Sequence, residues 1–301
     1  MNIVELLQKG IFRKVYLVAE RIIILIPDSV YLKMVYRNRL GKKLNLKNPV
    51  TFNEKLQWLK INNRNPRYTY MVDKYAVKKI VSDKIGEEHV IPTLGIYERF
   101  EDIDFDKLPN AFVLKCTHDS GSVLICRDKK KLNKKAARKK FNSALKRSYY
   151  WGNREWPYKD VPRRIIAEPY IESLGNDDSI EYKITCFDGK LGFTTICTGK
   201  AHSKISERKN DFYDPDFKML PFWSFYKHSD NPITEKPPIL DTIIDYAEKI
   251  AEGIPYLRVD FYVLDDHIYF GEATFFTWGG FNKFVPEEWD KKLGKMIKLP
   301  K

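Results

Sequence analysis

Cysteine is scarce in this sequence: there are four in 301 residues, and no two form a CxxC pair. A zinc ribbon therefore lacks its ligands. Each cysteine lies in an apolar run typical of a β-strand, so we expect reduced and buried thiols, as in a cytoplasmic protein. They are Cys116, Cys126, Cys186 and Cys197.

A long hydrophobic run is also missing. Residues 11–26 are largely apolar, but charged residues interrupt them, and their longest apolar stretch has five residues, Ile22–Ile26, before Pro27. A membrane-spanning helix needs about 20, and a signal peptide needs a cleaner apolar centre. We expect a cytoplasmic protein in which 11–26 is an amphipathic helix packed on the domain. The alternative is a peripheral helix at the inner face of the membrane, where basic residues meet anionic lipid.

Several catalytic and nucleotide-binding motifs are absent. The sequence has no GxxxxGK[ST] loop and no GxGxxG after a strand, which leaves P-loop and Rossmann nucleotide sites unsupported. It has no GxSxG elbow and no HExxH pair. Its histidines lack ligand spacing to one another, and no internal repeat or low-complexity tract stands out.

The composition is that of a folded, basic protein. Hydrophobic residues make up 43% and aromatic residues 14%, enough for a packed core. The formal net charge is +13, a property shared by nucleic-acid binders, membrane-surface proteins and enzymes of acidic polymers. Residues 127–147 alone hold eleven basic residues and one acid. We expect a solvated helix face there, or a docking surface for an anionic glycan or membrane.

Apolar periodicity predicts helices followed by a mixture of strands and helices. Residues 1–45 form two helices around Pro27, and Thr51 with Glu54 has the spacing of a capping box. Residues 198–238 have no clear period and form a long irregular excursion. The other predicted helices are 51–61, 73–85, 131–150 and 239–252, and the predicted strands are 111–116, 123–126, 165–170, 181–187, 192–197, 256–264 and 267–273.

Charged residues at strand ends are the candidates for chemistry. Lys115 precedes the polar loop 117–122, which makes either a phosphate clamp or an ordinary hairpin with a surface lysine. The strand end Glu168–Ile171 exposes backbone groups that could bind the edge of an adenine. Glu181 and Lys183 project from one face of their strand because strand side chains alternate.

The last predicted hairpin carries the strongest signal. Asp260 and Glu272 lie on its two strands, so their carboxylates can converge on Mg²⁺ near bound phosphates. Arg258 shares the face of Asp260 and is suited to a developing oxyanion. The alternative is a surface hairpin with alternating charges, but the neighbouring aromatic residues favour a functional site, since bare carboxylates are costly in apolar surroundings.

Taken in order, these features resemble the ATP-grasp superfamily of carboxylate–amine ligases. More narrowly, PVTFNEKLQWLK, VDKYAVKKIV and GGFNKFVPEEWDKKLG resemble the TupA-like branch, which acts in teichuronopeptide and polysaccharide biosynthesis. The resemblance runs from about residue 35 to the end. It implies an α+β ATP-grasp fold, in which two subdomains clasp ATP, with a helical N-terminal region. The implied divisions are a helical region 1–70, a linker 71–110, a small lid-like subdomain 111–167, and a C-terminal subdomain 168–301 with the insertion 198–238.

The resemblance also implies roles for individual residues. The catalytic residues would be Arg258, which stabilises an acyl phosphate, and Lys115. Asp260 and Glu272 would bind Mg²⁺. The residues expected to contact ATP are Lys74, Lys115, Ser120, Gly121, Ser122, Glu168, Pro169, Tyr170, Ile171 and Lys183.

Two departures from the family pattern matter. Many members have Asn two residues after the second acidic ligand, where this chain has Thr274, so one metal site is expected to be weaker or differently built. Residues 1–70 also have the pattern of helices, so we do not expect them to form the Rossmann-like N-terminal domain that is common elsewhere in the superfamily. The usual basis for inferring the carboxylate substrate is therefore missing.

The resulting hypothesis is an ATP- and Mg²⁺-dependent ligase of capsular or cell-surface polysaccharide assembly. It would join a uronic acid or amino acid to an amine through an acyl phosphate. We expect the acceptor site in 198–238, with His202, Arg208 and Tyr213 as contacts. One alternative is a metal-dependent glycosyltransferase, suggested by two DxD strings at 102–104 and 214–216. The other is a basic nucleic-acid-binding module, which lacks a recognisable signature here.

Overall fold

The structure is a computed structural model that describes residues 24–172, 180–198 and 208–300. Its strands are β1 (Gly95–Tyr97), β2 (Phe112–Cys116), β3 (Val123–Cys126), β4 (Ile165–Pro169), β5 (Ile180–Phe187), β6 (Lys190–Thr198), β7 (Lys209–Tyr213), β8 (Trp223–Ser224), β9 (Tyr256–Leu264), β10 (His267–Thr274) and β11 (Phe284–Val285). Its helices are α3 (Asp28–Leu40), α4 (Phe52–Asn62), α5 (Arg67–Val72), α6 (Ala76–Ile85), α7 (Lys134–Leu145), α8 (Tyr150–Asn153), α9 (Leu240–Ala251) and α10 (Glu288–Met296), and the 3₁₀ turn η6 covers Thr277–Gly280.

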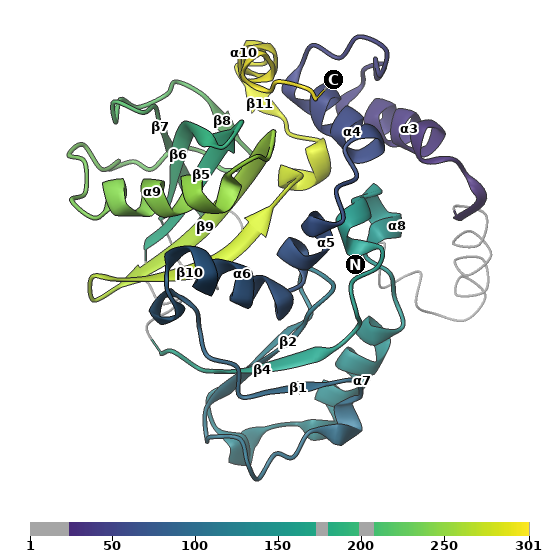
Figure 1. Ribbon diagram of the computed structural model, residues 1–301, viewed down its shortest axis with the longest axis vertical. Helices are drawn as coiled ribbons and strands as arrows, with labels where there is room; N and C mark the ends of the chain where they lie inside the picture. The colour runs from purple at the N-terminus through teal and green to yellow at the C-terminus, as the bar shows by residue number, and fades with distance from the viewer. Residues whose placement is uncertain (1–23, 173–179, 199–207, 301) are drawn as a thin grey trace.

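Two antiparallel sheets organise the chain. The smaller has the strand order β1-β4-β2-β3, and the larger has the order β10-β9-β5-β6-β7. Figure 1 shows the two sheets toward opposite ends of the molecule, with α5 and α6 between them. A short pair, β11-β8, is separate from both.

Each main sheet has its own hydrophobic core. The smaller sheet packs against α7 through Phe112, Leu114 and Phe141, all fully buried. The larger sheet packs against α9, whose Ile243, Ala247 and Ile250 have no exposed surface, together with residues of α4 to α6 and α10. The two sheets are thus packed separately, which leaves room for a cavity between them. A third, small cluster joins Leu32 and Tyr36 of α3 to Leu44 and Phe281.

Most of the predicted elements are confirmed. The capping box is present: Thr51 Oγ1 accepts from the Glu54 amide at 3.2 Å, and the Glu54 carboxylate accepts from the Thr51 amide at 3.0 Å. The second predicted N-terminal helix is α3, which ends at Gly41 in the left-handed conformation. The predicted hairpins β2–β3, β5–β6 and β9–β10 all form. The first predicted helix lies largely outside the described residues.

Two predictions need correction. The helix expected over 131–150 is shorter, because the Asn133 side chain caps it by accepting from the Ala136 amide at 2.9 Å, and a separate helix, α8, follows. The excursion expected over 198–238 is not irregular throughout. Lys209–Tyr213 forms β7, the edge strand of the larger sheet paired with β6. Its burial does not alternate, which explains why no period of two was visible.

The expected domain limits remain predictions, and two of them cut through elements. The limit at 167/168 falls inside β4, and the linker 71–110 contributes β1 to the smaller sheet. Within the described ranges, none of the helices combines the length and apolar character needed to cross a membrane.

The contact between α10 and the start of α4 depends on a glycine. A Cβ at Gly294 would lie 2.3 Å from the Val50 carbonyl oxygen and 2.7 Å from the Phe52 amide nitrogen. We therefore expect Gly294→Ala to lower the free energy of unfolding by about 1–3 kcal/mol, measured by urea denaturation. Gly152→Ala is the matched control, since nothing lies within 4 Å of its Cβ position. Equal stability of the two variants would contradict the prediction.

Candidate active site

A cavity of about 880 Å³ lies between the two sheets. Lys115 and Glu168 line it from the smaller sheet, and Lys183, Arg258 and Glu272 line it from the larger one. Side chains from opposite ends of the chain thus meet in one space, and most of the residues predicted to be functional border it.

Three neighbouring strands align the charges of the larger sheet. Lys183 on β5 is directly opposite Asp260 on β9, which is opposite Glu272 on β10. A β-bulge between Phe270 and Glu272 makes this alignment possible. If the pairing ran on regularly from Phe270, Gly271 would lie opposite Asp260, and Glu272 would lie opposite Val259 and face the other side of the sheet.

These side chains form one ion-pair network. Arg258 donates to Asp260 through Nε and Nη2, both at 2.6 Å, and its Nη2 also donates to Glu272 Oε1 at 3.0 Å. Lys183 Nζ lies 2.9 Å from Asp260 Oδ2 and 2.6 Å from Glu181 Oε1. Asp260 is 1% exposed, so the cavity-lining side chains of the network surround a buried carboxylate. The predicted convergence of Asp260, Glu272 and Arg258 is therefore observed.

The network shifts the proton affinities of its members. Burial alone would raise the pKa of Asp260, but Arg258 and Lys183 outweigh burial and hold that pKa below its ordinary value. Burial alone would lower the pKa of Lys183, but Asp260 raises it further than burial lowers it. Asp260 is thus an anion and Lys183 a cation at neutral pH.

The oxygen donors of this wall fit a magnesium ion held jointly with phosphates. Mg²⁺ typically uses one or two carboxylates and takes its other oxygens from phosphates and water. The Glu272 side chain is 53% exposed and lines the cavity, whereas Asp260 lies behind Arg258. Thr274, at the position where Asn was expected, donates to Glu272 Oε1 at 3.0 Å. In the described ranges, no three His, Cys, Asp or Glu side chains are grouped to hold a metal, so a phosphate contribution is needed.

A second network lies on the smaller sheet. Glu168, 5% exposed, forms ion pairs with Lys115 at 2.7 Å and with Lys78 of α6 at 2.5 Å. Burial would raise the pKa of Glu168, but the two lysines outweigh burial and lower it. Lys115 is therefore paired with a buried counterion and is not an isolated surface lysine. Lys78 is a second partner of Glu168, which the sequence did not indicate.

The lowered pKa of Glu168 gives a pH prediction. A carboxyl whose pKa is lower in the folded state contributes stability above its unfolded pKa and loses it as the pH falls through the folded pKa. We expect the difference in unfolding free energy between wild type and Glu168→Gln to be constant above about pH 5 and to shrink below about pH 4. Urea denaturation at several pH values measures it. A difference that grows in acid would contradict the assignment.

The loop 117–122 is tied to the segment before α6. Lys74 Nζ donates to the Asp119 carbonyl oxygen, and the Lys74 amide donates to the Thr117 carbonyl oxygen at 3.2 Å. Ser120 and Gly121 line the cavity, as does Lys74, whose pKa is lowered by burial. Ser122 instead donates its hydroxyl to Asp119 and does not border the cavity, so its contribution is to the shape of the loop.

The segment proposed for adenine also borders the cavity. Glu168, Pro169, Tyr170 and Ile171 all line it at the end of β4. The Tyr170 hydroxyl accepts from Arg127 Nε at 3.0 Å, which orients the ring. The geometry brings this segment and Lys115 to one wall.

The expected acceptor residues are separated. His202 lies outside the described residues, and Arg208 lines the cavity. Tyr213 is 1% exposed, donates its hydroxyl to the Ile233 carbonyl oxygen at 2.8 Å and stacks on Phe217. It does not border the cavity, so its observed contacts are structural.

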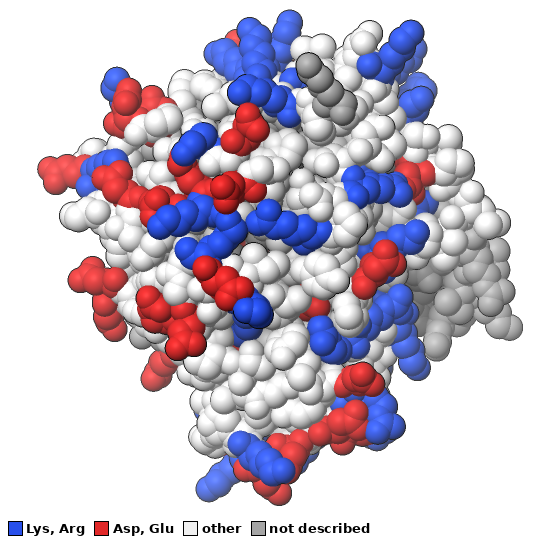
Figure 2. All heavy atoms as spheres, viewed as in Figure 1, with Lys and Arg blue, Asp and Glu red and all other residues white. Residues whose placement is uncertain are grey.

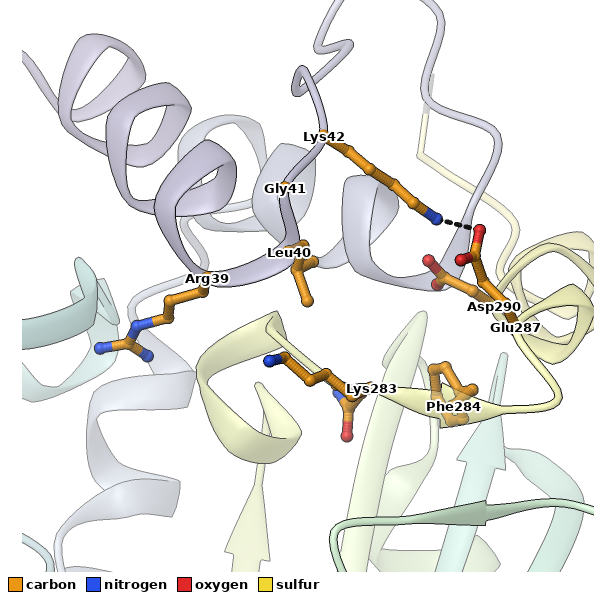
Figure 3. Close-up of a pocket in the computed structure, with 9 residues that line it drawn as sticks. Arg39, Leu40, Gly41, Lys42, Lys283, Phe284, Glu287 and Asp290 are labelled. Carbon is orange, nitrogen blue, oxygen red and sulfur yellow. Dashed lines mark hydrogen bonds and ion pairs between the residues drawn. The ribbon is translucent and has the colours of Figure 1, made fainter.

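A smaller cavity of about 420 Å³ adjoins the larger one. Arg39, Asn282 and Phe284 line both cavities. Figure 3 shows Lys42 paired with Glu287 near one end, while Arg39 and Lys283 extend toward the other. Because α3 supplies Arg39, the N-terminal helical region reaches the candidate site, a contribution that no sequence pattern indicated.

The basic segment 127–147 has partners of its own. Arg138 pairs with Glu101 at 2.6 Å, Lys134 lies over the Phe105 ring at 4.6 Å, and Lys140 donates to the Val123 carbonyl oxygen. Figure 2 shows Lys and Arg side chains interspersed with Asp and Glu over the face in view. Part of the basic charge therefore stabilises the smaller sheet and its neighbours.

The two DxD strings do not reach either cavity. Asp102 pairs with Arg99 and Asp104 with Lys107, and the Asp214 carboxylate accepts from the amides of Asp216 and Lys218. These carboxylates satisfy local turns, which weakens the case for a sugar-nucleotide metal site.

Comparisons with known proteins give a family and several similar structures. A family model described as TupA-like ATPgrasp matches residues 54–298. A D-alanine–D-alanine ligase from Helicobacter pylori is 15% identical with a TM-score of 0.43, over 82% of this chain and 69% of its own. The same ligase from Bacillus anthracis, complexed with ATP, is 19% identical with a TM-score of 0.39, over 68% and 54%. The ATP-grasp ligase PsnB is 11% identical with a TM-score of 0.43, over 77% and 61%. No curated protein matches the sequence.

Proposed function

This chain belongs to the TupA-like ATP-grasp family, and on that premise we propose that it joins a carboxylate to an amine in the assembly of a capsular or other cell-surface polysaccharide. Membership confirms the ATP-grasp fold and the enzyme class predicted from the sequence, an ATP-dependent, amide-forming ligase. The carboxylate we propose is a uronic acid or an amino acid. The support for the polysaccharide role is the name TupA in the family's description.

The observation that carries the proposal is the single cavity with cations on both walls. Lys74 and Lys115 stand on one side, and Lys183 and Arg258 on the other. A triphosphate with several negative charges fits between them. Glu168–Ile171 at the end of the same wall would hold the adenine.

The reaction we propose has two steps. A substrate carboxylate oxygen attacks the γ-phosphorus of ATP, and the bond to the bridging oxygen breaks to release ADP. The amine nitrogen then attacks the acyl carbon, phosphate leaves with the bonding pair, and the amine proton is released. Arg258, held rigidly by Asp260, would stabilise the negative charge that develops at the acyl phosphate. Glu272 would hold Mg²⁺ together with the phosphates, whose charge the ion would neutralise. Asp260 would join it as a ligand only through an oxygen that Arg258 or Lys183 releases.

The test is ADP release from ATP and Mg²⁺ with pairs of candidate substrates, with mass spectrometry of the products. Glucuronic acid and glutamate serve as carboxylates, and amino sugars and amino acids serve as amines. The proposal expects ADP and an amide in equal amounts for at least one pair. Consumption of a sugar nucleotide without ADP release would instead support the glycosyltransferase alternative.

A further inference from the structure

Two large aromatic side chains at the rim of the main cavity are unusually exposed. Trp278 of η6 is 44% exposed and Phe225, just after β8, is 43% exposed. Their rings stack with centroids 4.0 Å apart and planes 28° apart, and the Tyr226 ring lies 5.8 Å from Trp278. Trp278 and Tyr226 line the cavity whereas Phe225 does not, so Phe225 backs the Trp278 ring.

Both residues of this stack have a backbone conformation that bulky side chains rarely adopt. Phe225 has φ +63° and Trp278 has φ +54°. The Tyr226 amide donates to the Ser224 carbonyl oxygen at 2.8 Å, so Phe225 is at the tip of a three-residue turn. Such strain persists where the surroundings enforce it, and it concentrates at ligand-binding positions.

Buried polar side chains of α4 enforce the conformation around Trp278. Gln57 and Lys60 are 0% and 1% exposed. Lys60 Nζ donates to the Gly279 carbonyl oxygen at 2.6 Å, and Gln57 Nε2 donates to the Gly280 carbonyl oxygen at 2.6 Å. The buried side chains of Gln57 and Lys60 thus hold the left-handed turn that positions Trp278.

Polar atoms without partners flank the aromatic stack. Ser224 is 5% exposed and lines the cavity, and its hydroxyl has no hydrogen-bond partner within the described ranges. The same holds for Oδ1 of Asn153, a cavity residue packed against Gly279. An aromatic face beside an unused hydroxyl and an unused amide oxygen suits a ring that is apolar on its face and carries hydroxyls on its edge.

We propose that Trp278, backed by Phe225, is a stacking platform for a pyranose ring of the substrate. The C–H face of the sugar packs on the indole, and its hydroxyls hydrogen-bond with Ser224 and Asn153 after these side chains rotate, because their unpartnered oxygens are buried. This inference rests on the proposed function, since the platform lies in the cavity that holds Arg258 and Glu272. It names the part of the site that selects a sugar over an open-chain carboxylate.

Binding measurements test the platform independently of ligase turnover. The probes are methyl β-D-glucuronide, glucuronate oligosaccharides and glutamate, followed by saturation-transfer NMR, with ATP binding followed by calorimetry. We expect the wild type to bind at least one pyranose probe and Trp278→Ala to weaken that binding about tenfold. Trp278→Phe, which keeps a flat ring, should lose less. Tyr70→Ala is the control, because Tyr70 is 60% exposed and does not line the cavity.

Several results would overturn the platform. One is a wild type that binds none of the pyranose probes. Another is unchanged sugar affinity in both Trp278→Ala and Phe225→Ala. A third is a Trp278→Ala variant that loses affinity for ATP but keeps its affinity for the sugar probes. That result would show that the indole ring binds adenine instead of a sugar. Phe225→Ala changes an exposed turn, so it tests the platform even if Trp278→Ala does not fold. Sugar and ATP binding without ADP release would leave the platform standing and refute the ligase proposal.

Discussion

Replacing Asp260 with alanine is expected to lower the free energy of unfolding by about 3–5 kcal/mol in urea denaturation at pH 7. Asp260 is 1% exposed and contacts both Arg258 and Lys183 at 2.9 Å or less. Its loss leaves two cations in the sheet without their main counterion, and their desolvation is then uncompensated. The variant should also lose ADP release, because Arg258 is no longer held in place.

The control for Asp260 is a carboxylate in an exposed ion pair. Asp216 is 77% exposed and lies 3.5 Å from Lys218. Asp216→Ala should change the free energy of unfolding by less than about 1 kcal/mol, because exposed ion pairs contribute little. Similar stabilities for Asp260→Ala and Asp216→Ala would mean that the network does not depend on its central charge.

Glu272→Gln is expected to reduce ADP release by about 100-fold or more with little loss of stability. The side chain is 53% exposed at the cavity wall, so its charge is available to a metal ion. The amide keeps the size of the side chain but removes the charge, so the unfolding free energy should stay within about 1 kcal/mol of wild type. Steady-state ADP release at saturating ATP, together with urea denaturation, separates the two effects.

Glu252→Gln is the matched control for Glu272. Glu252 is also an exposed carboxylate, 80% exposed and 3.1 Å from Lys84, but it does not line the cavity. Its substitution should leave ADP release unchanged. Full activity in Glu272→Gln would remove Glu272 from the proposed metal site while leaving the stability prediction for Asp260 intact.

Local patterns were sufficient to predict the strands that carry these carboxylates. Alternation of apolar and polar residues on either side of Asp265–Asp266 predicts the β9–β10 hairpin, and its residue limits are nearly as expected. The convergence of Asp260 and Glu272 was also predicted, but the bulge at Gly271 that makes it possible was not. A glycine inside a strand is compatible with several local geometries, and only the pairing of both strands selects one.

Other parts of the site depend on contacts between distant segments. Lys78 reaches Glu168 across 90 positions of the chain, and Arg39 enters the site from α3. In the sequence, nothing distinguishes Trp278 from the other aromatic residues of its segment. The buried donors that orient it come from α4, more than 200 residues earlier in the chain. No local periodicity encodes these contacts. The sequence could therefore indicate the charged residues of the candidate active site, but not all the residues that line its cavity.

The boundary between the two sheets has a mechanical consequence. Contacts from α6 and the residues before it to the smaller sheet and its loops are polar: Lys78 with Glu168, Lys74 with the Asp119 carbonyl and Asp73 with Arg164 at 2.8 Å. The hydrophobic cores of the two main sheets are separate. Polar contacts can exchange for water, so the two bodies can hinge apart without opening either core. Ionic strength should therefore act on the opening of the cavity more directly than on the folding of either half.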